Sequence, residues 1–520
     1  MTSAPMTDRD RLSRVTIANS LANLVRAASG SFENIVLPVV LIAVLSRTDY
    51  SNWALVFSIA AYITYLDFGL QTATQALVSR ALANEDEANA ARVARSALRV
   101  YFIVAVAALL LAALASQSLA WIFPDIPDPA VHAVGATLLV LAAGQAANLG
   151  VNVIAGFYAG AHRSHVTAYS IALARCVSLL LSLAAAFSGL DILIVAVGYS
   201  VPLVITFIGV LVKLLRETRS SRWTTATRED IRSFNVNART LLVFSGPLVL
   251  WNICSIFVGA VGTAIVGRVD YDALPYFSIA MMLTVAITGI ANALLQPFLT
   301  NIGLSAKSAS PSERTGAVVA ALRLNGGILL LLITGGMGGF VVMGCLDLIA
   351  DDSAALLTTS MIVAATGLRL AMTPFNMAFL ASDDHRRIIA QPIIEAAVAV
   401  VGGVVLGGIL GALGVGIASL CSALIAVLML LFWSLRGSAW FPLLNVPTAI
   451  RALAPAAACT ALVLAADVAL GSLRAPLIAT LLIEIALVLA SAILAYRSAP
   501  RDARALILKI VLRRTVHRKR

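Results

Sequence analysis

Hydrophobic residues form long, nearly uninterrupted runs along this chain, and short polar segments separate the runs. A run of about 20 apolar residues is long enough for a helix to cross a bilayer about 30 Å thick. When the longest runs are split at charged or glycine-rich turns, about fourteen such segments result. Their centres fall near Gly30, Tyr65, Leu110, Leu141, Leu179, Ile205, Ser255, Thr288, Ile333, Leu368, Val400, Ile425, Ala461 and Ile485. The pattern predicts an all-α polytopic membrane protein with about 14 transmembrane helices.

The composition supports this fold class. With 60% hydrophobic residues, 12% charged residues and a mean hydropathy of +0.94, a chain of 520 residues is too apolar for a soluble globule. A net charge of +11 would suggest a nucleic-acid partner in a soluble protein. Here most of the 37 Lys and Arg residues lie in alternate short loops, which is the pattern of a topology signal. We therefore expect no nucleic-acid partner and both termini in the cytoplasm.

Three short motifs recur in the two halves at nearly one offset. Residues 47–50 and 57–60 recur as 268–271 and 277–280, and residues 162–163 recur as 385–386. If each half holds six spans, the two copies have the same membrane orientation. The repeat predicts two parallel six-helix bundles related by a pseudo-twofold axis along the membrane normal.

The chain divides by sequence into five parts. We expect an N-terminal six-helix bundle at 1–215, a cytoplasmic linker at 216–239, a C-terminal six-helix bundle at 240–437, two additional transmembrane helices at 438–498, and a basic amphipathic cytoplasmic tail at 499–520. The tail interleaves apolar residues with Lys and Arg, which is typical of a helix on an anionic leaflet. A role only in fixing the topology is the alternative.

The first apolar run carries a polar stripe. Asn19, Asn23, Arg26, Gly30 and Glu33 follow one another at helical spacing, so they share one face of a helix. At about 1.5 Å per residue, Arg26 lies about 15 Å deep, near the bilayer centre. An ionisable residue at that depth is a candidate functional site, and pairing with an acid on another helix is the structural alternative.

Two further arginines lie inside apolar runs. Arg175 and Arg369 have polar companions at helical spacing, and Asn376 follows Arg369 on the same face. Arginines from both halves suggest a cationic cavity that holds an anion such as phosphate bidentately. An ion pair with an acid such as Glu395 is an equally good explanation. Pro374 can bend its helix and free a carbonyl group. The candidate substrate-binding residues are Arg26, Asn23, Arg175, Arg369, Asn376, Asn252 and Asn292.

Glu33 and Asp67 are the candidates for proton or sodium coupling, because acids inside the membrane often mark ion pathways. Asp67 lies at a depth similar to that of Arg26, so an ion pair between Asp67 and Arg26 is the alternative.

Several chemistries have no support in the sequence. There is no Gly-Lys pair, so a Walker A loop and a built-in ATPase are excluded. The five cysteines fall inside apolar runs at no ligand spacing, and the five histidines lie near segment ends without metal spacing. The outer loops are short. We therefore expect no cofactor, no metal site, no disulfide and no soluble catalytic domain.

The chain resembles a known family. The segments 37–50, 53–55 and 65–70, the polar turn that ends at Arg80, and the segments 156–163, 245–247, 276–280 and 411–418 are similar to those of bacterial Wzx-type polysaccharide transporters. These transporters are a branch of the multidrug/oligosaccharidyl-lipid/polysaccharide flippase superfamily. The likeness covers most of residues 15–498.

The resemblance implies a flippase that moves undecaprenyl-pyrophosphate-linked oligosaccharide across the bacterial inner membrane for O-antigen, capsule or exopolysaccharide biosynthesis. Arg26 occupies the kind of first-helix position where related lipid II flippases keep a cation. The implied partners are the lipid-linked substrate, membrane lipids and a glycan polymerase or export machinery.

Two other functions are weighed against the flippase. A cation-coupled multidrug exporter of the same superfamily usually presents acids to cationic drugs and has twelve spans. A membrane-embedded glycan polymerase or ligase usually needs a long periplasmic loop with catalytic residues, and the sequence has no such loop. We therefore expect a transporter and not an enzyme.

Overall fold

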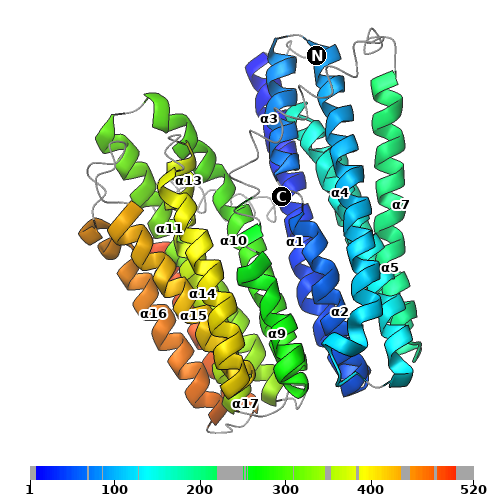
Figure 1. Cartoon of the computed structure of the whole chain (residues 1–520). Helices are drawn as coiled ribbons and strands as arrows, with labels where there is room; N and C mark the ends of the chain where they lie inside the picture. The colour runs from blue at the N-terminus through cyan, green and yellow to red at the C-terminus, as the bar shows by residue number, and fades with distance from the viewer. Residues whose placement is uncertain are drawn as a thin grey trace, which may run out of the picture. The chain divides into compact units, whose positions relative to one another are not determined.

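The computed structural model describes residues 8–66, 69–84, 86–126, 128–219, 250, 253–254, 256–308, 310–345, 353–381, 386–434, 446–472 and 477–498. Its elements are helices, with short π and 3-10 stretches between some of them (Figure 1). Among the described residues, 11 helices are long and apolar enough to cross a membrane. The all-helical, multi-pass architecture is confirmed, and the count of fourteen spans stays a prediction.

The chain splits into two compact units, Met1–Met282 and Leu283–Arg520. The first holds α1 (Asp8–Val44), α2 (Arg47–Tyr65), α3 (Leu70–Ala83), α4 (Glu87–Ile122), α5 (Asp128–Gly160), α6 (His165–Phe187), α7 (Ile192–Arg219), η1 (Ile256–Ala260), α9 (Val261–Val269), η2 (Tyr271–Ala273) and the start of α10 (Leu274–Ser308). The division falls inside α10. Residues 220–249, which hold most of the expected linker, lie outside the described residues, so the predicted domain boundaries stay predictions.

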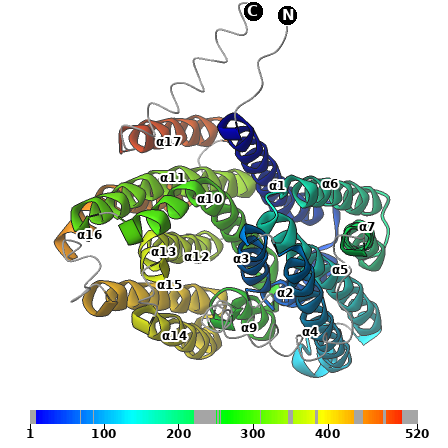
Figure 2. The same ribbon diagram turned by 90° about the horizontal axis from the view of Figure 1, so that it is seen from above.

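Helix α5 forms the centre of the first unit. It packs against α2, α3, α4 and α7, and Figure 2 shows this bundle end-on. Within its membrane-spanning window, 78% of the residues are buried, which is the largest share among the candidate spans of the described residues. Glycine makes the close packing possible, because a Cβ added at Gly160 would lie 2.6 Å from the carbonyl oxygen of Gln75 on α3.

The outward faces of this bundle are apolar. On α4 the exposed side chains include Ile103, Val106, Leu110 and Leu111. A soluble protein rarely exposes so large an apolar surface, whereas lipid tails cover such a surface in a membrane. The apolar outer face of α4 therefore agrees with the expected location of the chain in a membrane.

The second expected span is divided into two helices. Instead of one helix centred near Tyr65, the chain forms α2, which ends at Tyr65, and α3, which begins at Leu70. Gly69 immediately before α3 has φ +71°, a left-handed conformation that glycine adopts without steric cost. A glycine in this conformation ends a regular helix, so the span is interrupted.

The two copies of the internal repeat meet within the first unit. Tyr50 on α2 shares a hydrogen bond with Ser278 on α10, at 3.2 Å between the hydroxyl oxygens. The Tyr271 hydroxyl donates to Asn52 Oδ1. Arg47 Nη2 donates to the carbonyl oxygen of Asp272, at 3.0 Å. The repeated motifs therefore bind one another directly.

The second unit holds the rest of α10 with α11 (Pro311–Cys345), α12 (Ser353–Ala371), α13 (Thr373–Ala381), α14 (Arg386–Leu410), α15 (Ala412–Met429), η3 (Leu430–Ser434), α16 (Val446–Ser472) and α17 (Leu477–Ser498). Helix α15 packs on α12 and α14, and α11 packs on α12, α16 and α17. Its core includes Leu322, Met372, Phe375, Phe379 and Leu430.

The tenth expected span is interrupted close to Pro374, where the sequence predicts an irregularity. Helices α12 and α13 are separated at Met372, two residues before Pro374. Proline has no N–H, so the carbonyl group of Leu370 loses its helical donor. Asn325 on α11 replaces that donor, because its Nδ2 lies 2.8 Å from Leu370 O. A specific side-chain hydrogen bond thus stabilises the interruption.

Candidate functional site

The polar stripe of α1 faces the hairpin of α5 and α6. Asn19 Nδ2 donates to the carbonyl oxygen of His162 at 2.8 Å, and its Oδ1 accepts from the backbone N–H of His165 at 3.3 Å. These contacts tie one end of the stripe to the α5–α6 turn. Asn23, on the same helix, is exposed.

Arg26 lies one step further along the stripe. Its Nη2 donates to Asn152 Oδ1 on α5, at 3.0 Å, and the residue is half-buried. Asp67, the expected alternative partner of Arg26, lies outside the described residues, so that pairing stays a prediction.

Glu33 and Arg175 form a buried ion pair at the end of the stripe opposite Asn19. Arg175 Nη1 lies 2.8 Å from Glu33 Oε2, and the side chains are 23% and 3% exposed. Gly30 makes room for this pair, because a Cβ at position 30 would lie 3.0 Å from Arg175 Nη1. Four members of the stripe, Asn19, Arg26, Gly30 and Glu33, therefore contact α5, α6 or the turn between them.

Tyr199 on α7 completes the surroundings of this pair. Its hydroxyl oxygen accepts from Gln145 Nε2 at 3.4 Å, and its carbonyl oxygen accepts from Ser178 Oγ at 2.7 Å. Its ring meets those of Trp53 and Phe57 edge-on, at centroid distances of 6.5 and 5.3 Å. Polar and aromatic groups from α2, α5, α6 and α7 thus gather in one place.

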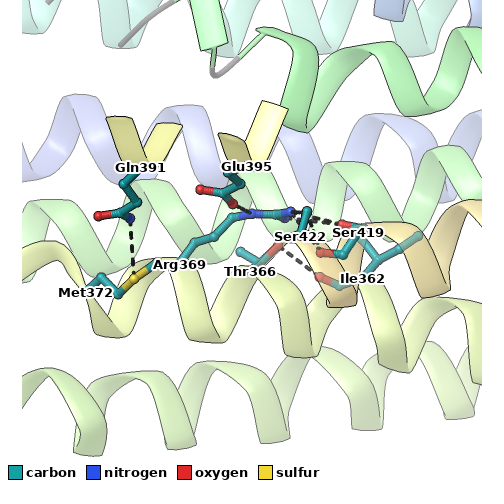
Figure 3. A network of polar contacts seen from close by, with 8 residues as sticks. All are labelled: Ile362, Thr366, Arg369, Met372, Gln391, Glu395, Ser419 and Ser422. Carbon is teal, nitrogen blue, oxygen red and sulfur yellow. Dashed lines mark hydrogen bonds and ion pairs between the residues drawn. The ribbon is translucent and has the colours of Figure 1, made fainter. Parts of the chain in front are cut away.

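Arg369 is the centre of a corresponding network in the second unit (Figure 3). Its Nε donates to Glu395 Oε1 on α14 at 2.6 Å. Its Nη2 donates to the carbonyl oxygen of Ser419 at 3.0 Å and to Ser422 Oγ at 2.9 Å, and Nη1 donates to Ser419 Oγ at 3.2 Å. One guanidinium group therefore joins α12, α14 and α15.

These geometries favour a structural role for Arg175 and Arg369. Each is bound to a carboxylate, and Arg369 has the partner, Glu395, that the sequence names as its alternative. All three nitrogen atoms of Arg369 already donate to protein oxygens. An anion would have to displace these acceptors.

The remaining candidates are dispersed. Asn376 is buried on α13, and Asn292 is exposed on α10. Asn252 lies outside the described residues. In the part of the chain that the structure describes, no group of three or more His, Cys, Asp or Glu residues is arranged to hold a metal ion.

Sequence reasoning missed the neutral partners of the charged residues. Asn152 lies in an apolar run with nothing to mark it as a partner of an arginine, and Ser419 and Ser422 also lie in an apolar run. The spacing of Ser419 and Ser422, one helical turn apart, was the available signal, since it places both hydroxyl groups on one face.

The family model MatE matches residues 31–183 of this chain. Among solved structures, the lipid II flippase MurJ in an inward closed conformation matches with a TM-score of 0.64 and 14% identity, over 92% of this chain and 99% of that chain. A eukaryotic MATE transporter, AtDTX14, matches with a TM-score of 0.61 and 16% identity, over 85% and 99%. The chain has the fold of these transporters.

A multidrug resistance MATE family transporter of the MOP superfamily, in an inward-facing conformation, is also similar. Its TM-score is 0.55 at 17% identity, and the match covers 78% of this chain and 96% of that chain. No curated protein matches this chain in sequence. The MatE match covers residues 31–183, the structural neighbours share the fold, and neither comparison singles out the polysaccharide branch.

Proposed function

We propose that this chain is a flippase that moves undecaprenyl-pyrophosphate-linked oligosaccharide across the bacterial inner membrane by alternating access. The observation that carries the proposal is the match to the lipid II flippase, which spans 92% of this chain and 99% of that one. The two MATE transporters compared above match 78% and 85% of this chain. The broader match agrees with a chain that has α16 and α17 packed on α11.

The physical problem that such a transporter solves is a polar headgroup. Sugars and a pyrophosphate cannot enter hydrocarbon without losing their hydrogen bonds to water, which costs several kcal/mol per group. A protein path lined with donors replaces that water, while the lipid tail stays in the bilayer. This logic favours a cationic path for an anionic headgroup.

Arg26 is the arginine that we propose for the pyrophosphate. It is half-buried, and Asn152 positions its guanidinium group at 3.0 Å. Arg175 and Arg369 are engaged by carboxylates, so we assign them to the framework. Asn23, exposed on the same helix, is proposed as a polar neighbour of the path.

Glu33 and Asp67 are the acids proposed for coupling to a proton or sodium ion. Glu33 Oε2 is bound to Arg175, and its buried Oε1 has no hydrogen-bond partner among the described residues. Coupling at Glu33 would require the ion pair with Arg175 to loosen during transport. The proposed partners are the lipid-linked substrate, membrane lipids and a glycan polymerase or export machinery, with both termini in the cytoplasm.

The test is surface glycan in a deletion strain complemented with wild type, Arg26→Ala, Arg26→Lys or Arg497→Ala. Arg497 is exposed at the end of α17 and serves as the matched control. At equal membrane abundance, wild type and Arg497→Ala are expected to restore glycan, and both Arg26 variants are expected to fail. Normal export by Arg26→Ala would remove Arg26 from the site, and glycan unaffected by the deletion would overturn the flippase assignment.

Multidrug export is the second candidate. The MatE match over residues 31–183 and the MATE structures favour it. The same deletion strain separates the two functions, because loss of a drug exporter increases drug sensitivity and leaves surface glycan intact.

A further inference from the structure

Among the described residues, α17 packs mainly on one neighbour, α11. The two helices lie side by side in Figure 2, whereas α17 and α16 touch each other little. Within its membrane-spanning window only 17% of the residues are buried, which is the smallest share among the candidate spans of the described residues. The outward face of α17 is apolar, with Ile478 74% and Leu482 64% exposed. The protein therefore covers little of this helix.

The face of α17 that meets α11 is polar. It carries three buried residues, each no more than 5% exposed: Thr480, Glu484 and Ser491. Steps of four and seven residues place these side chains on one face of the helix. A buried carboxyl group and two buried hydroxyl groups thus lie in the contact with α11.

Two hydrogen bonds mark the ends of this contact. Thr334 Oγ1 and Ser491 Oγ lie 2.9 Å apart. Cys345 Sγ donates to Thr480 Oγ1 at 3.8 Å. Thr480 comes early in α17 and meets the last residue of α11, whereas Ser491 comes late and meets an earlier turn. The helices therefore run antiparallel, and the two hydrogen bonds form together in one register.

Glu484 lies between these hydrogen bonds, against a glycine of α11. A Cβ added at Gly338 would come 2.9 Å from Glu484 Cδ and closer still to Oε2. A side chain at position 338 would thus displace the carboxyl group. Glu484 lies about 10 Å from the start of α17, well inside the apolar span. Glycine gives the carboxyl group room inside the contact between the two helices.

Apolar contacts select a register poorly inside a membrane. Lipid tails are as apolar as a leucine side chain, so membrane helices associate through close packing and interhelical hydrogen bonds. A polar group that slides out of its contact into hydrocarbon loses these interactions. For α17, a slip of one helical turn would move the Glu484 carboxyl group away from Gly338 and break both hydrogen bonds.

We propose that Glu484, seated on Gly338, fixes the register of α17 on α11. Thr480 and Ser491 align the helix on either side of the carboxyl group. A single buried polar residue sets the register of coiled coils in the same way, at a cost in stability. This role concerns how the chain is assembled, so it does not depend on what the protein transports.

The experiment measures disulfide formation in the full chain, oxidised with copper phenanthroline in isolated membranes. The four native cysteines other than Cys345 are replaced by alanine. Thr480→Cys then places a thiol opposite Cys345 and reports the observed register. Val341→Cys with Thr480→Cys, in a chain that also carries Cys345→Ala, reports a slip of one helical turn. Disulfide-linked peptides are quantified by mass spectrometry.

With Glu484 present, the first cysteine pair is expected to cross-link and the second is expected to stay largely reduced. Glu484→Leu should lower cross-linking of the first pair several-fold and raise that of the second. Gly338→Leu, which fills the space of the carboxyl group from the α11 side, should act in the same way. Glu484→Gln keeps a polar group of nearly the same size and should keep the register.

Ile485→Ala is the matched control, because this neighbour of Glu484 is 55% exposed on the outward face of α17. It should change neither cysteine pair. The variants are compared as the monodisperse fraction from size-exclusion chromatography, which removes misfolded chains. Unchanged cross-linking of the first pair in both Glu484→Leu and Gly338→Leu would overturn the proposal. An equal loss in Ile485→Ala would also overturn it, since general loosening of α17 would then explain the result.

Discussion

The two buried ion pairs, Arg175 with Glu33 and Arg369 with Glu395, each hold an arginine inside an apolar bundle, but the two arginines have different numbers of hydrogen-bond acceptors. Arg175 and Arg369 are about equally exposed, with 23% and 21% of their side chains accessible. Arg175 has one carboxylate, Glu33, whereas Arg369 has Glu395 together with Ser419 and Ser422. Solvent exposure therefore does not distinguish the two sites. They differ in the number of helices that each guanidinium group joins.

This difference bears on which parts can move. Arg369 ties α12, α14 and α15 through several hydrogen bonds, so a motion of one helix would break many contacts. Arg175 ties α6 to α1 through one carboxylate, beside Gly30. We infer that α1 can shift relative to α5 and α6 at lower cost than any helix of the Arg369 network.

The largest expected effect is that of Arg369→Leu. Removing this side chain leaves Glu395 buried without its counter-charge, which costs about 3–5 kcal/mol. We expect a large loss of Tm and of membrane abundance, measured by fluorescence-detected thermal unfolding. A variant as stable as wild type would show that the network of Figure 3 contributes little to the stability of the protein.

Arg175→Leu should destabilise by about 3 kcal/mol, at the lower end of the range for a buried pair. The double variant Arg175→Leu/Glu33→Leu should recover most of the stability, because it removes both charges. The double variant Arg369→Leu/Glu395→Leu should recover less, since Ser419 and Ser422 lose their donor. Equal recovery in the two double-mutant cycles would remove the distinction between the sites.

A smaller effect is expected from Ser422→Ala. Its hydroxyl oxygen accepts from Arg369 Nη2 at 2.9 Å, and loss of a hydrogen bond to a charged group costs about 1.5–3 kcal/mol. The variant should unfold at a lower temperature than wild type but above Arg369→Leu. Ser360→Ala, which removes a hydroxyl group bonded within its own helix to Leu356 O, is the matched control.

Gly30→Ala should change the stability least. The added Cβ comes 3.0 Å from Arg175 Nη1, the flexible end of a long side chain, which can move by a few tenths of an ångström. Alanine also favours the helix over glycine by about 1 kcal/mol, which offsets the displacement. A net change within about 1 kcal/mol is expected. A much larger loss would mean that Arg175 cannot yield and that α1 is held rigidly.

The sequence predicted local features well. The helical spacing of the stripe on α1 was informative because side chains three or four residues apart share a face, and four of its five members have partners or close contacts on that face. Pro374 predicted the break between α12 and α13, because the missing N–H has a local consequence. Gly69 did not predict the break between α2 and α3, since glycine is common inside membrane helices.

Long-range partners were harder to predict. The pair of Glu33 and Arg175 joins residues far apart in sequence, and nothing in the sequence marks Arg175 as the partner of Glu33. Glu395 was named for Arg369 because few acids lie in the apolar runs, but its serine partners could not be chosen among many similar residues. Charged residues are scarce in the apolar runs, so the sequence offers few candidates for a charged partner. Neutral polar residues are common there, so the sequence does not single out a neutral partner.

The most direct test of the transport function is translocation in proteoliposomes. A fluorescent oligosaccharide on undecaprenyl pyrophosphate would be incorporated, and its exposure would be followed with a membrane-impermeant quencher. Wild type is expected to move the headgroup across the membrane much faster than protein-free vesicles or Arg26→Ala do, and the exposed-site control Arg497→Ala is expected to match wild type. Wild-type vesicles that leave this lipid in place but move a cationic drug would contradict the account.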